Sequence, residues 1–332
     1  MNKLVQNFVH RPGVHCESTA LRNIYEFYGF NFTEPMIFGL GSALGFVYWK
    51  TEWMKFPFIG GRINDLDRNL CDNLGVGLEI RKTSSRRKAY QSLKELISSG
   101  IPVAIHVDMP YLKYLKLSKE AHFGAHTVVV AGLDEEGGIA YIADTQYEKL
   151  QIATLGELEE ARASKFGPFP AQNVWLEFKF PLKLSPLNKA IKRAIVRTAD
   201  SMLNPPIKNL GIKGIRHFGS EIVKWLEEYP PQEFGWGYKF TYVYLEEDGS
   251  GGGCFRYLFS RFLREASDLI ESDELKSLGD KYEQVGRKWT EAAHLIKDIP
   301  NGGKVGNIQK LLFEIADEEE EVLSALQGVM ES

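Results

Sequence analysis

The 332-residue sequence has only three cysteines, Cys16, Cys71 and Cys254, and no CxxC pair. An odd number of thiols without paired spacing argues against a disulfide framework and against a zinc knuckle. We therefore expect reduced thiols and no metal centre.

Long runs of one residue type are also missing. No apolar run approaches the roughly 18 residues of a membrane span, and the first residues lack the hydrophobic core of a signal peptide. Basic residues gather only at 86–88, and the formal net charge is −4, which does not fit a nucleic-acid-binding surface. These absences predict a cytoplasmic protein that binds neither membranes nor nucleic acids.

The sequence does contain enough apolar residues for a large core: 44% are hydrophobic and 25% charged, as in ordinary globular proteins. Chains beyond roughly 250–300 residues tend to split their core. The pattern changes near residues 181–186, after which nearly every segment has helical spacing. We therefore predict an α+β protein with two domains, 1–183 and a mainly α-helical 184–332.

In the N-terminal domain, apolar spacing predicts a helix over residues 16–28 that Gly29 ends. Residues 35–61 are rich in glycine and aromatic residues, which favours a long loop that either lines a site or packs in the core. The other predicted elements are helices over 63–74 and 88–98 and strands over 78–82, 101–107, 125–133, 139–143, 149–152 and 174–180. Helices first and antiparallel strands later are typical of an α+β domain.

The C-terminal domain is predicted to be almost entirely helical. Helices are expected over residues 187–203, 215–229, 255–272, 274–299 and 305–330, with a strand pair or extended loop around 238–245. The acidic run at 317–321 is most simply a solvated helix face.

Cys16 opens the first predicted helix. Because N–H groups at a helix N-terminus stabilise an anion, a thiol there carries more thiolate than an ordinary one, which suits covalent acyl transfer. Such a nucleophile needs a histidine as base. The sequence offers seven: His10, His15, His106, His122, His126, His217 and His294.

A predicted hairpin selects His126 among them. His126 starts one strand and Asp144 ends the returning strand, and a turn centred near 135–136 sets one of residues 144–146 opposite His126, about 5 Å away at Cβ. A slip of one residue would substitute Thr145, and Gln146 is a further candidate. Taken one at a time, each residue has a purely structural alternative. Asp144 could cap a turn, and His126 could be a hydrogen-bonded histidine at the start of a strand. Together with Cys16, the pair favours catalysis.

This order of residues resembles the papain-like fold, in which a cysteine opens a helix, a histidine lies on a strand and an aspartate ends the next. Segments 20–29, 126–132 and 143–145 are similar to bacteriocin-processing cysteine peptidases. Segments 13–19, 58–62 and 124–126 resemble the butirosin-biosynthesis BtrH-like acyltransferase family. The C-terminal half, with 251–256 and 262–266, resembles the helical domain usually fused to it.

The resemblance implies a cofactor-free acyl-thioester mechanism of antibiotic biosynthesis. Cys16 accepts the acyl group, His126 transfers the proton and Asp144 orients His126. An acyl carrier protein and a small-molecule amine are the implied partners. Whether the chain forms a homo-oligomer is left open by the sequence. The alternatives are an amidase or peptidase with the same triad and a non-catalytic binding protein that keeps the fold.

The residue that stabilises the oxyanion departs from the papain-like pattern. Papain-like enzymes usually place a glutamine shortly before the cysteine, at a position that holds His10 here. His10 or the backbone N–H of Cys16 would then stabilise the oxyanion, and the alternative for His10 is a surface role. His15, the neighbour of Cys16, is a supporting candidate.

Three arginines, Arg62, Arg256 and Arg261, are candidates for binding the substrate. Guanidinium groups and helix N-termini both suit carboxylates and phosphates, including that of phosphopantetheine. For Arg256 and Arg261, which follow the glycines at 251–253, the alternative is a flexible linker and an ordinary amphipathic helix.

Overall fold

The computed structural model describes residues 4–52, 54–63 and 65–331. They form two compact units: the chain up to Glu34 with Gly75–Leu184, and Pro35–Leu74 with the chain from Ser185. The last segment of the first unit ends at Leu184, one residue beyond the end of the predicted N-terminal domain. The units differ from the predicted contiguous domains in one segment, because residues 35–74 pack with the C-terminal helices.

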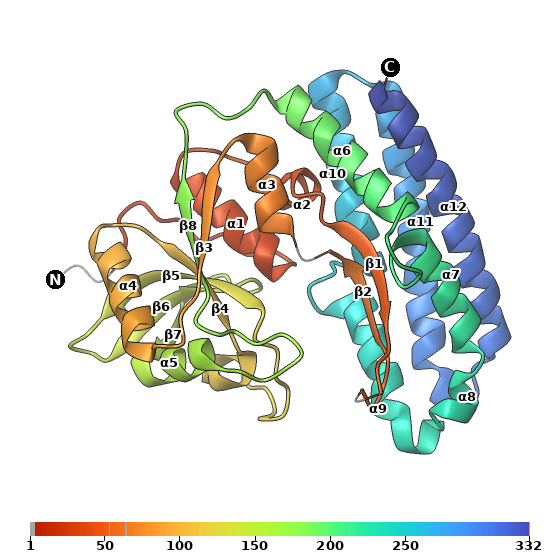
Figure 1. Cartoon of the computed structure of the whole chain (residues 1–332), viewed down its shortest axis with the longest axis horizontal. Coiled ribbons are helices and arrows are strands. Elements are labelled where there is room, and N and C mark those ends of the chain that lie inside the picture. Colours follow the sequence, from red (N-terminus) through yellow and green to blue (C-terminus); the bar gives the residue numbers. More distant parts are fainter. Residues whose placement is uncertain (1–3, 53, 64, 332) are drawn as a thin grey trace. The chain divides into compact units, whose positions relative to one another are not determined.

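The first unit is built on a six-stranded antiparallel sheet with the strand order β3-β8-β4-β5-β6-β7 (Figure 1). Its strands are β3 (Gly77–Arg81), β4 (Val103–Val107), β5 (His126–Asp134), β6 (Ile139–Ala143), β7 (Gln151–Thr154) and β8 (Trp175–Lys179). Its helical segments are α1 (Cys16–Phe27), α4 (Arg86–Ser98), α5 (Leu155–Ala163) and the 3₁₀ turns η1 (Met109–Tyr111) and η2 (Lys113–Leu115). The α+β prediction is confirmed, and each predicted strand lies within two residues of an observed one at both ends.

Helices cover both faces of β5, whose residues are almost all buried. Successive strand residues point to opposite faces. Val128 and Val130 belong to a core shared with Leu93 of α4 and Leu158 of α5, and α1 packs on β4 and β5 as well. The apolar run of β5 therefore reflects a strand at the centre of the unit.

The β5–β6 hairpin contains a bulge. Gly132 pairs with Tyr141 near the turn, but Val130 pairs with Ile142 and Val129 with Ala143. Continued beyond Ala143, this register sets Asp144 beside Val128 and Gln146, the last of the three residues predicted, opposite His126. Asp144 is therefore diagonal to His126 and not directly opposite it. Diagonal neighbours on one face are still within reach of long side chains. The bulge inserts one residue and so shifts the register.

The second unit is mainly helical, as predicted (Figure 1). Its helices are α3 (Leu66–Leu74), α6 (Leu187–Leu203), α7 (Gly211–Ile222), α8 (Trp225–Glu228), α9 (Pro231–Tyr242), α10 (Arg256–Ile270), α11 (Asp273–Lys297) and α12 (Val305–Glu331), while α2 (Glu34–Leu40) begins at the end of the first unit's segment. A π-helical turn η3 (Val243–Glu247) and the 3₁₀ turns η4 (Gly253–Phe255) and η5 (Ile299–Asn301) connect them. No helix in the described part of the chain combines the length and apolar character that crossing a membrane requires.

Two predictions for this unit are wrong. Residues 35–61 are not a long loop: they form α2 and most of the hairpin β1 (Leu44–Trp49) and β2 (Phe58–Arg62). Several of their aromatic residues belong to the core, where Phe46 and Tyr48 stack on Phe218 of α7. Residues 238–245 are helical in α9 and η3 rather than extended, because Tyr238 is buried and bonds to the carbonyls of Trp225 and Tyr229.

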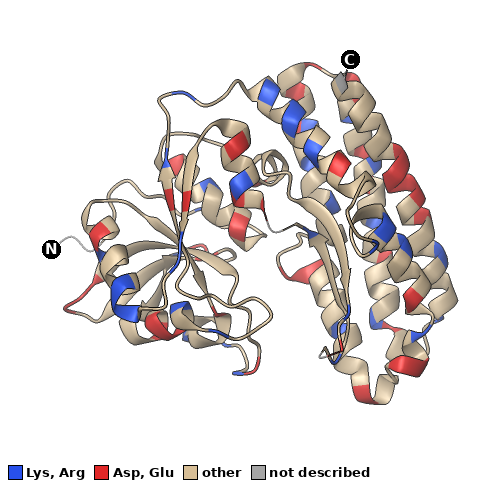
Figure 2. Cartoon of the chain, in the orientation of Figure 1, with Lys and Arg blue, Asp and Glu red and all other residues tan. Residues whose placement is uncertain are grey.

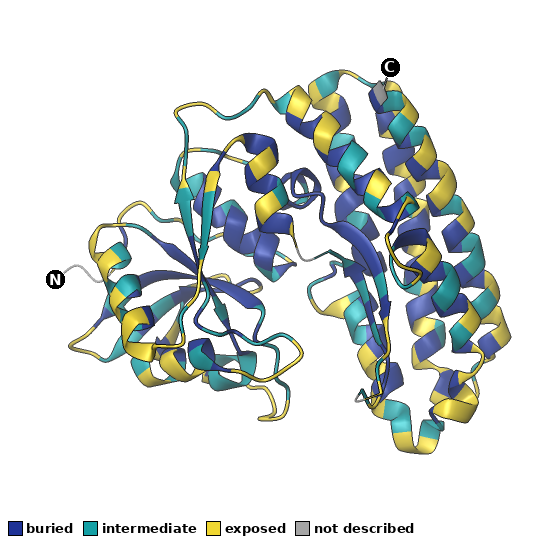
Figure 3. Cartoon of the chain, viewed as in Figure 1, coloured by how far each residue is buried: buried dark blue, intermediate teal, exposed yellow. Residues whose placement is uncertain are grey.

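The acidic run on α12 divides between surface and core. Figure 2 shows acidic residues along α12, and exposed members of the run pair with Arg216, Lys281 and Lys288. Glu319, in contrast, is fully buried with Arg256 of α10. Figure 3 shows that the long helices of this unit alternate between buried and exposed residues along their length. The prediction of a solvated face holds for its neighbours but not for Glu319.

Candidate active site

Cys16 is the first residue of α1 and is partly exposed. The preceding residue His15 is the N-cap, and its Nδ1 accepts a hydrogen bond of 3.3 Å from the Ser18 N–H. The helix continues because Leu21 and Ile24 form part of a buried stripe on the core side. The sequence thus places the thiol at a helix start, as predicted.

His126, the first residue of β5, is buried between Asp144 and Cys16. Its Nε2 lies 2.8 Å from Asp144 Oδ1, and its ring also forms a hydrogen bond with the Cys16 side chain. The structure therefore brings together the three residues that the sequence analysis selected as a triad.

Asp144 is held by more than the histidine. Its Oδ2 accepts a hydrogen bond of 2.8 Å from the Tyr114 hydroxyl, and its Oδ1 accepts one of 2.7 Å from the Thr145 N–H. The Thr145 carbonyl in turn accepts a hydrogen bond of 2.7 Å from the Gly13 N–H. A continuous set of hydrogen bonds thus links the carboxylate to the segment that precedes Cys16.

The charges of the pair reinforce each other. Burial alone would lower the pKa of His126, but the charge and hydrogen bond of Asp144, followed by those of Cys16, raise it to about 10. Burial would raise the pKa of the Asp144 carboxyl, yet His126, Tyr114 and the Thr145 N–H hold it below its ordinary value. At neutral pH the site therefore holds an imidazolium beside a carboxylate, and a neighbouring cation favours a thiolate.

This arrangement is suited to nucleophilic chemistry. Because Nε2 of His126 faces Asp144, Nδ1 is the ring nitrogen left to take the thiol proton. A carboxylate that fixes the orientation of an imidazole next to a nucleophile is the arrangement that activates cysteines and serines in acyl transfer.

His10 does not have a nitrogen to spare for an oxyanion. Its Nε2 lies 2.6 Å from the Tyr147 carbonyl and its Nδ1 lies 3.2 Å from the Asn23 side-chain amide. Burial, partly offset by the bond to Tyr147, lowers the pKa of His10, so the ring is neutral and anchors the chain before Cys16. His15 caps α1, and the backbone N–H of Cys16 stays the predicted oxyanion donor.

The three arginine candidates all belong to the second unit. Arg256 is fully buried, with Nε and Nη2 on the two oxygens of Glu319 at 2.7 and 2.9 Å, and it also donates to the Cys254 carbonyl. Its guanidinium is therefore committed to the core, which argues against a substrate-binding role. Arg62 is half-buried and donates to the Ile63 carbonyl at 3.1 Å.

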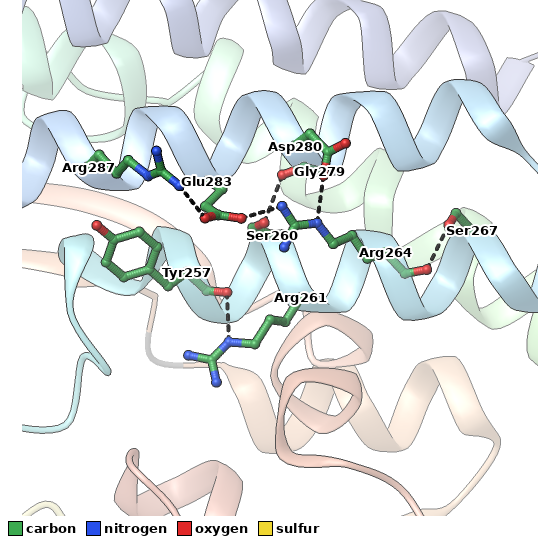
Figure 4. A network of polar contacts seen from close by, with 9 residues as sticks. All are labelled: Tyr257, Ser260, Arg261, Arg264, Ser267, Gly279, Asp280, Glu283 and Arg287. Carbon is green, nitrogen blue, oxygen red and sulfur yellow. Dashed lines mark hydrogen bonds and ion pairs between the residues drawn. The ribbon is translucent and has the colours of Figure 1, made fainter.

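Arg261 is exposed on α10. Its Nε donates a hydrogen bond of 3.2 Å to the Tyr257 carbonyl, one turn earlier in the helix (Figure 4). The nearby Arg264 bonds instead to Asp280 and Glu283 of α11. Of the three arginines, Arg261 alone is exposed to solvent, and its role in binding a substrate stays a prediction.

A second histidine–carboxylate pair lies in the same unit. His122 Nδ1 is 2.8 Å from Oδ2 of the fully buried Asp108, which also accepts from the Ser164 hydroxyl at 2.5 Å. The His122 ring stacks on Phe166 with centroids 3.6 Å apart. These contacts tie two loops together, and the pair provides a matched control for His126 and Asp144.

Two supporting residues were missed by the sequence analysis. Tyr114 lies in the 3₁₀ turn η2 of the long β4–β5 connection, and nothing in the local sequence indicates that its hydroxyl reaches Asp144. Asn23 lies seven residues after Cys16, so helical periodicity puts both residues on the same side of α1. That spacing could have identified Asn23.

We expect Tyr114→Phe to slow alkylation of Cys16 at neutral pH by about tenfold, since a hydrogen bond to a charged group contributes roughly 1.5–3 kcal/mol. The matched control is Tyr147→Phe, because among the described residues the Tyr147 hydroxyl donates to the Tyr114 carbonyl, at 3.3 Å, and forms no hydrogen bond with Asp144. Iodoacetamide labelling with peptide mass spectrometry measures both rates. Equal rates in the two variants would contradict a role for the Tyr114 hydroxyl.

Two family models match the chain. The model described as butirosin biosynthesis protein H, N-terminal, matches residues 15–145, and the model described as a domain of unknown function (DUF4872) matches residues 156–326. None of the curated proteins matches the chain significantly. The first match contains Cys16, His126 and Asp144, and the second covers most of the C-terminal helices. The chain therefore belongs to the family described as DUF4872, and its N-terminal part is similar to the N-terminal domain of butirosin biosynthesis protein H.

Proposed function

We propose that this protein is a cysteine-dependent acyltransferase of antibiotic biosynthesis, built on a papain-like fold, with Cys16, His126 and Asp144 as its triad. The observation that carries the proposal is the buried His126, which bonds to Asp144 through Nε2 at 2.8 Å and to the Cys16 side chain. The match of residues 15–145 to the N-terminal model of butirosin biosynthesis protein H supports an enzyme related to butirosin biosynthesis.

In the first half-reaction, the Cys16 thiolate attacks the carbonyl carbon of a carrier-protein thioester. The tetrahedral intermediate collapses, the bond from carbon to the carrier sulfur breaks, and the His126 imidazolium gives its proton to the departing thiolate. The acyl group is then held as a thioester on Cys16, and His126 is neutral.

In the second half-reaction, a small-molecule amine attacks the Cys16 thioester. Neutral His126 takes the proton from the attacking nitrogen, an amide bond forms and the thioester bond breaks. The Cys16 thiolate and the His126 imidazolium are both regenerated. Asp144 keeps the ring oriented and stabilises its charged form throughout.

Hydrolysis is the closest rival. If water instead of an amine resolves the thioester, the same triad is that of an amidase or peptidase, and only the acceptor differs. A binding protein that keeps the fold without catalysis is the other alternative. The partially exposed Cys16 and the hydrogen-bonded His126 favour an enzyme over a binding protein.

We expect acyl-carrier-protein thioesters to add the mass of their acyl group to the wild-type chain and to Cys71→Ala, but not to Cys16→Ala. Cys71 is the matched control, because it is a buried thiol on α3. Intact-protein mass spectrometry detects the adduct, and added amines should then remove it faster than water does. Turnover of amide substrates without any acyl adduct would contradict the acyltransferase and favour the hydrolase.

A further inference from the structure

Glu34 is a buried carboxylate at the start of α2, and only 6% of its surface is exposed. Its Oε1 accepts hydrogen bonds from the His15 N–H at 2.8 Å, from the Ser18 hydroxyl at 2.9 Å and from the Thr19 hydroxyl at 3.0 Å. Its Oε2 accepts one from the Val14 N–H at 3.0 Å. Four donors that flank Cys16 in the sequence therefore converge on one carboxylate.

These bonds fix the chain immediately before the thiol on two sides. The N–H groups of Val14 and His15 are bound to Glu34, while that of Gly13 is bound to the Thr145 carbonyl, next to Asp144. Three consecutive backbone donors are thus committed. The N-terminus of α1 is therefore attached both to Glu34 and to the segment that carries Asp144.

Gly13 shows how closely the carboxylate is packed. A Cβ at this position would lie 2.1 Å from the Thr19 hydroxyl oxygen and 2.5 Å from Glu34 Oε2. Any larger residue at 13 would have to displace the carboxylate or the hydroxyl. Glycine is therefore required for Glu34 to reach both backbone donors.

From this geometry we propose that Glu34 is a positioning residue, which holds residues 13–15 so that the Cys16 thiol stays within hydrogen-bond reach of His126. The inference rests on the proposed function of the triad and deepens it. Glu34 does not touch the reacting atoms. It acts through the backbone, by occupying the N–H groups that precede the helix.

The negative charge of Glu34, considered by itself, opposes ionisation of the Cys16 thiol. The charged or titratable groups that the described contacts place near Cys16 include His126 on β5 with Asp144 behind it and the sequence neighbours His15 and Glu17. Glu34 adds a carboxylate that bonds to the His15 N–H, and its charge interacts with that of Arg22. A negative charge beside a thiol opposes its ionisation. A group kept there despite this cost is expected to act through geometry.

Two variants separate geometry from charge. Glu34→Gln keeps the length of the side chain, and its amide oxygen can still accept from His15, Ser18 and Thr19, but the charge is lost. Glu34→Asp keeps the charge and withdraws the carboxylate by one methylene. The control Glu26→Gln removes a carboxylate from the last turn of α1, where it bonds to Arg11.

The experiment is the pH profile of Cys16 alkylation by iodoacetamide in the full-length chain, with thermal melting recorded for each variant. Glu34→Asp should raise the midpoint towards the ordinary thiol value of about 8.5, with a loss of about tenfold in rate at pH 7 for each unit of increase. Glu34→Gln should keep the midpoint at or below that of the wild type. Glu26→Gln should match the wild type.

The positioning role would be overturned if Glu34→Asp had the wild-type pH profile. It would also be overturned if Glu34→Asp and Glu34→Gln lost the same factor in alkylation rate, even if both variants melted at a lower temperature. An ordinary midpoint in the wild-type chain is a different outcome, because it contradicts the activated triad and with it the proposed function. The two failures are therefore distinguishable.

Discussion

His126→Ala should lower the rate of acyl-enzyme formation at Cys16 by about 10³-fold, within the range observed for loss of a general acid or base. The reason is that His126 takes the thiol proton and stabilises the thiolate, and Asp144 has no other route to the thiol among the described contacts. Single-turnover mass spectrometry with an acyl thioester measures the rate.

His122→Ala is the control, because His122 also pairs with a buried aspartate at 2.8 Å but is not hydrogen-bonded to Cys16 in any described contact. Its acylation rate should equal that of the wild type. A loss of similar size in both variants would mean that removing a histidine–carboxylate pair merely disturbs the unit, and would contradict the catalytic role of His126.

The pH dependence follows from the directions of the two pKa shifts. Because the pKa of His126 is raised from 6.5 to about 10, its contribution to stability is complete below 6.5 and is lost as the pH rises through 10. Because the pKa of Asp144 is lowered, its contribution is present above the ordinary value of 3.8 and is lost as the pH falls through the lowered one. The ion pair should therefore persist across the neutral range, and Asp144→Asn should move Cys16 alkylation to higher pH.

Glu319→Gln should destabilise the second unit by about 3–5 kcal/mol, the usual cost of leaving one partner of a buried ion pair uncompensated. Both side chains of the Arg256–Glu319 pair are fully buried, and Glu319 also accepts from Trp289 Nε1 at 2.8 Å. Burial would lower the pKa of Arg256, but the charge of Glu319 raises it, so the arginine stays charged. Guanidinium denaturation of the full chain measures the loss.

The control is Glu320→Gln, the adjacent acidic residue, which forms an exposed pair with Arg216 and should cost no more than about 1 kcal/mol. Replacing both members of the buried pair, as Arg256→Met with Glu319→Leu, should recover most of the stability because no charge is then left alone. A wild-type unfolding curve for Glu319→Gln would contradict the structural role and reopen Arg256 as a ligand-binding residue.

Much of the candidate site could be predicted from the sequence because it depends on local rules. Periodicity and Gly29 locate α1, so Cys16 is correctly placed at a helix start. The hairpin pattern locates β5 and β6, so His126 is correctly placed at the start of β5 and Asp144 directly after the end of β6. The β-bulge beyond Val130 has no signal in the residues, and the exact register therefore needed the structure.

The features that were missed depend on long-range contacts. Tyr114 reaches the site from the turn η2 and Glu34 from the start of α2, and neither has a local pattern that marks its partner. Residues 35–61 were predicted as a loop because glycine and aromatic residues suggest one, but Phe46 and Tyr48 are buried against α7. Arg256 is a candidate for binding anions on sequence grounds, but its guanidinium pairs with Glu319, 63 residues further along the chain.

The central claim, that Cys16 is activated by His126 and Asp144, is tested most directly by the pH profile of Cys16 alkylation in the wild-type chain, resolved by peptide mass spectrometry. The triad predicts a midpoint well below the ordinary thiol pKa of about 8.5 and a shift towards that value in His126→Ala. A wild-type midpoint near 8.5 that His126→Ala leaves unchanged would contradict it.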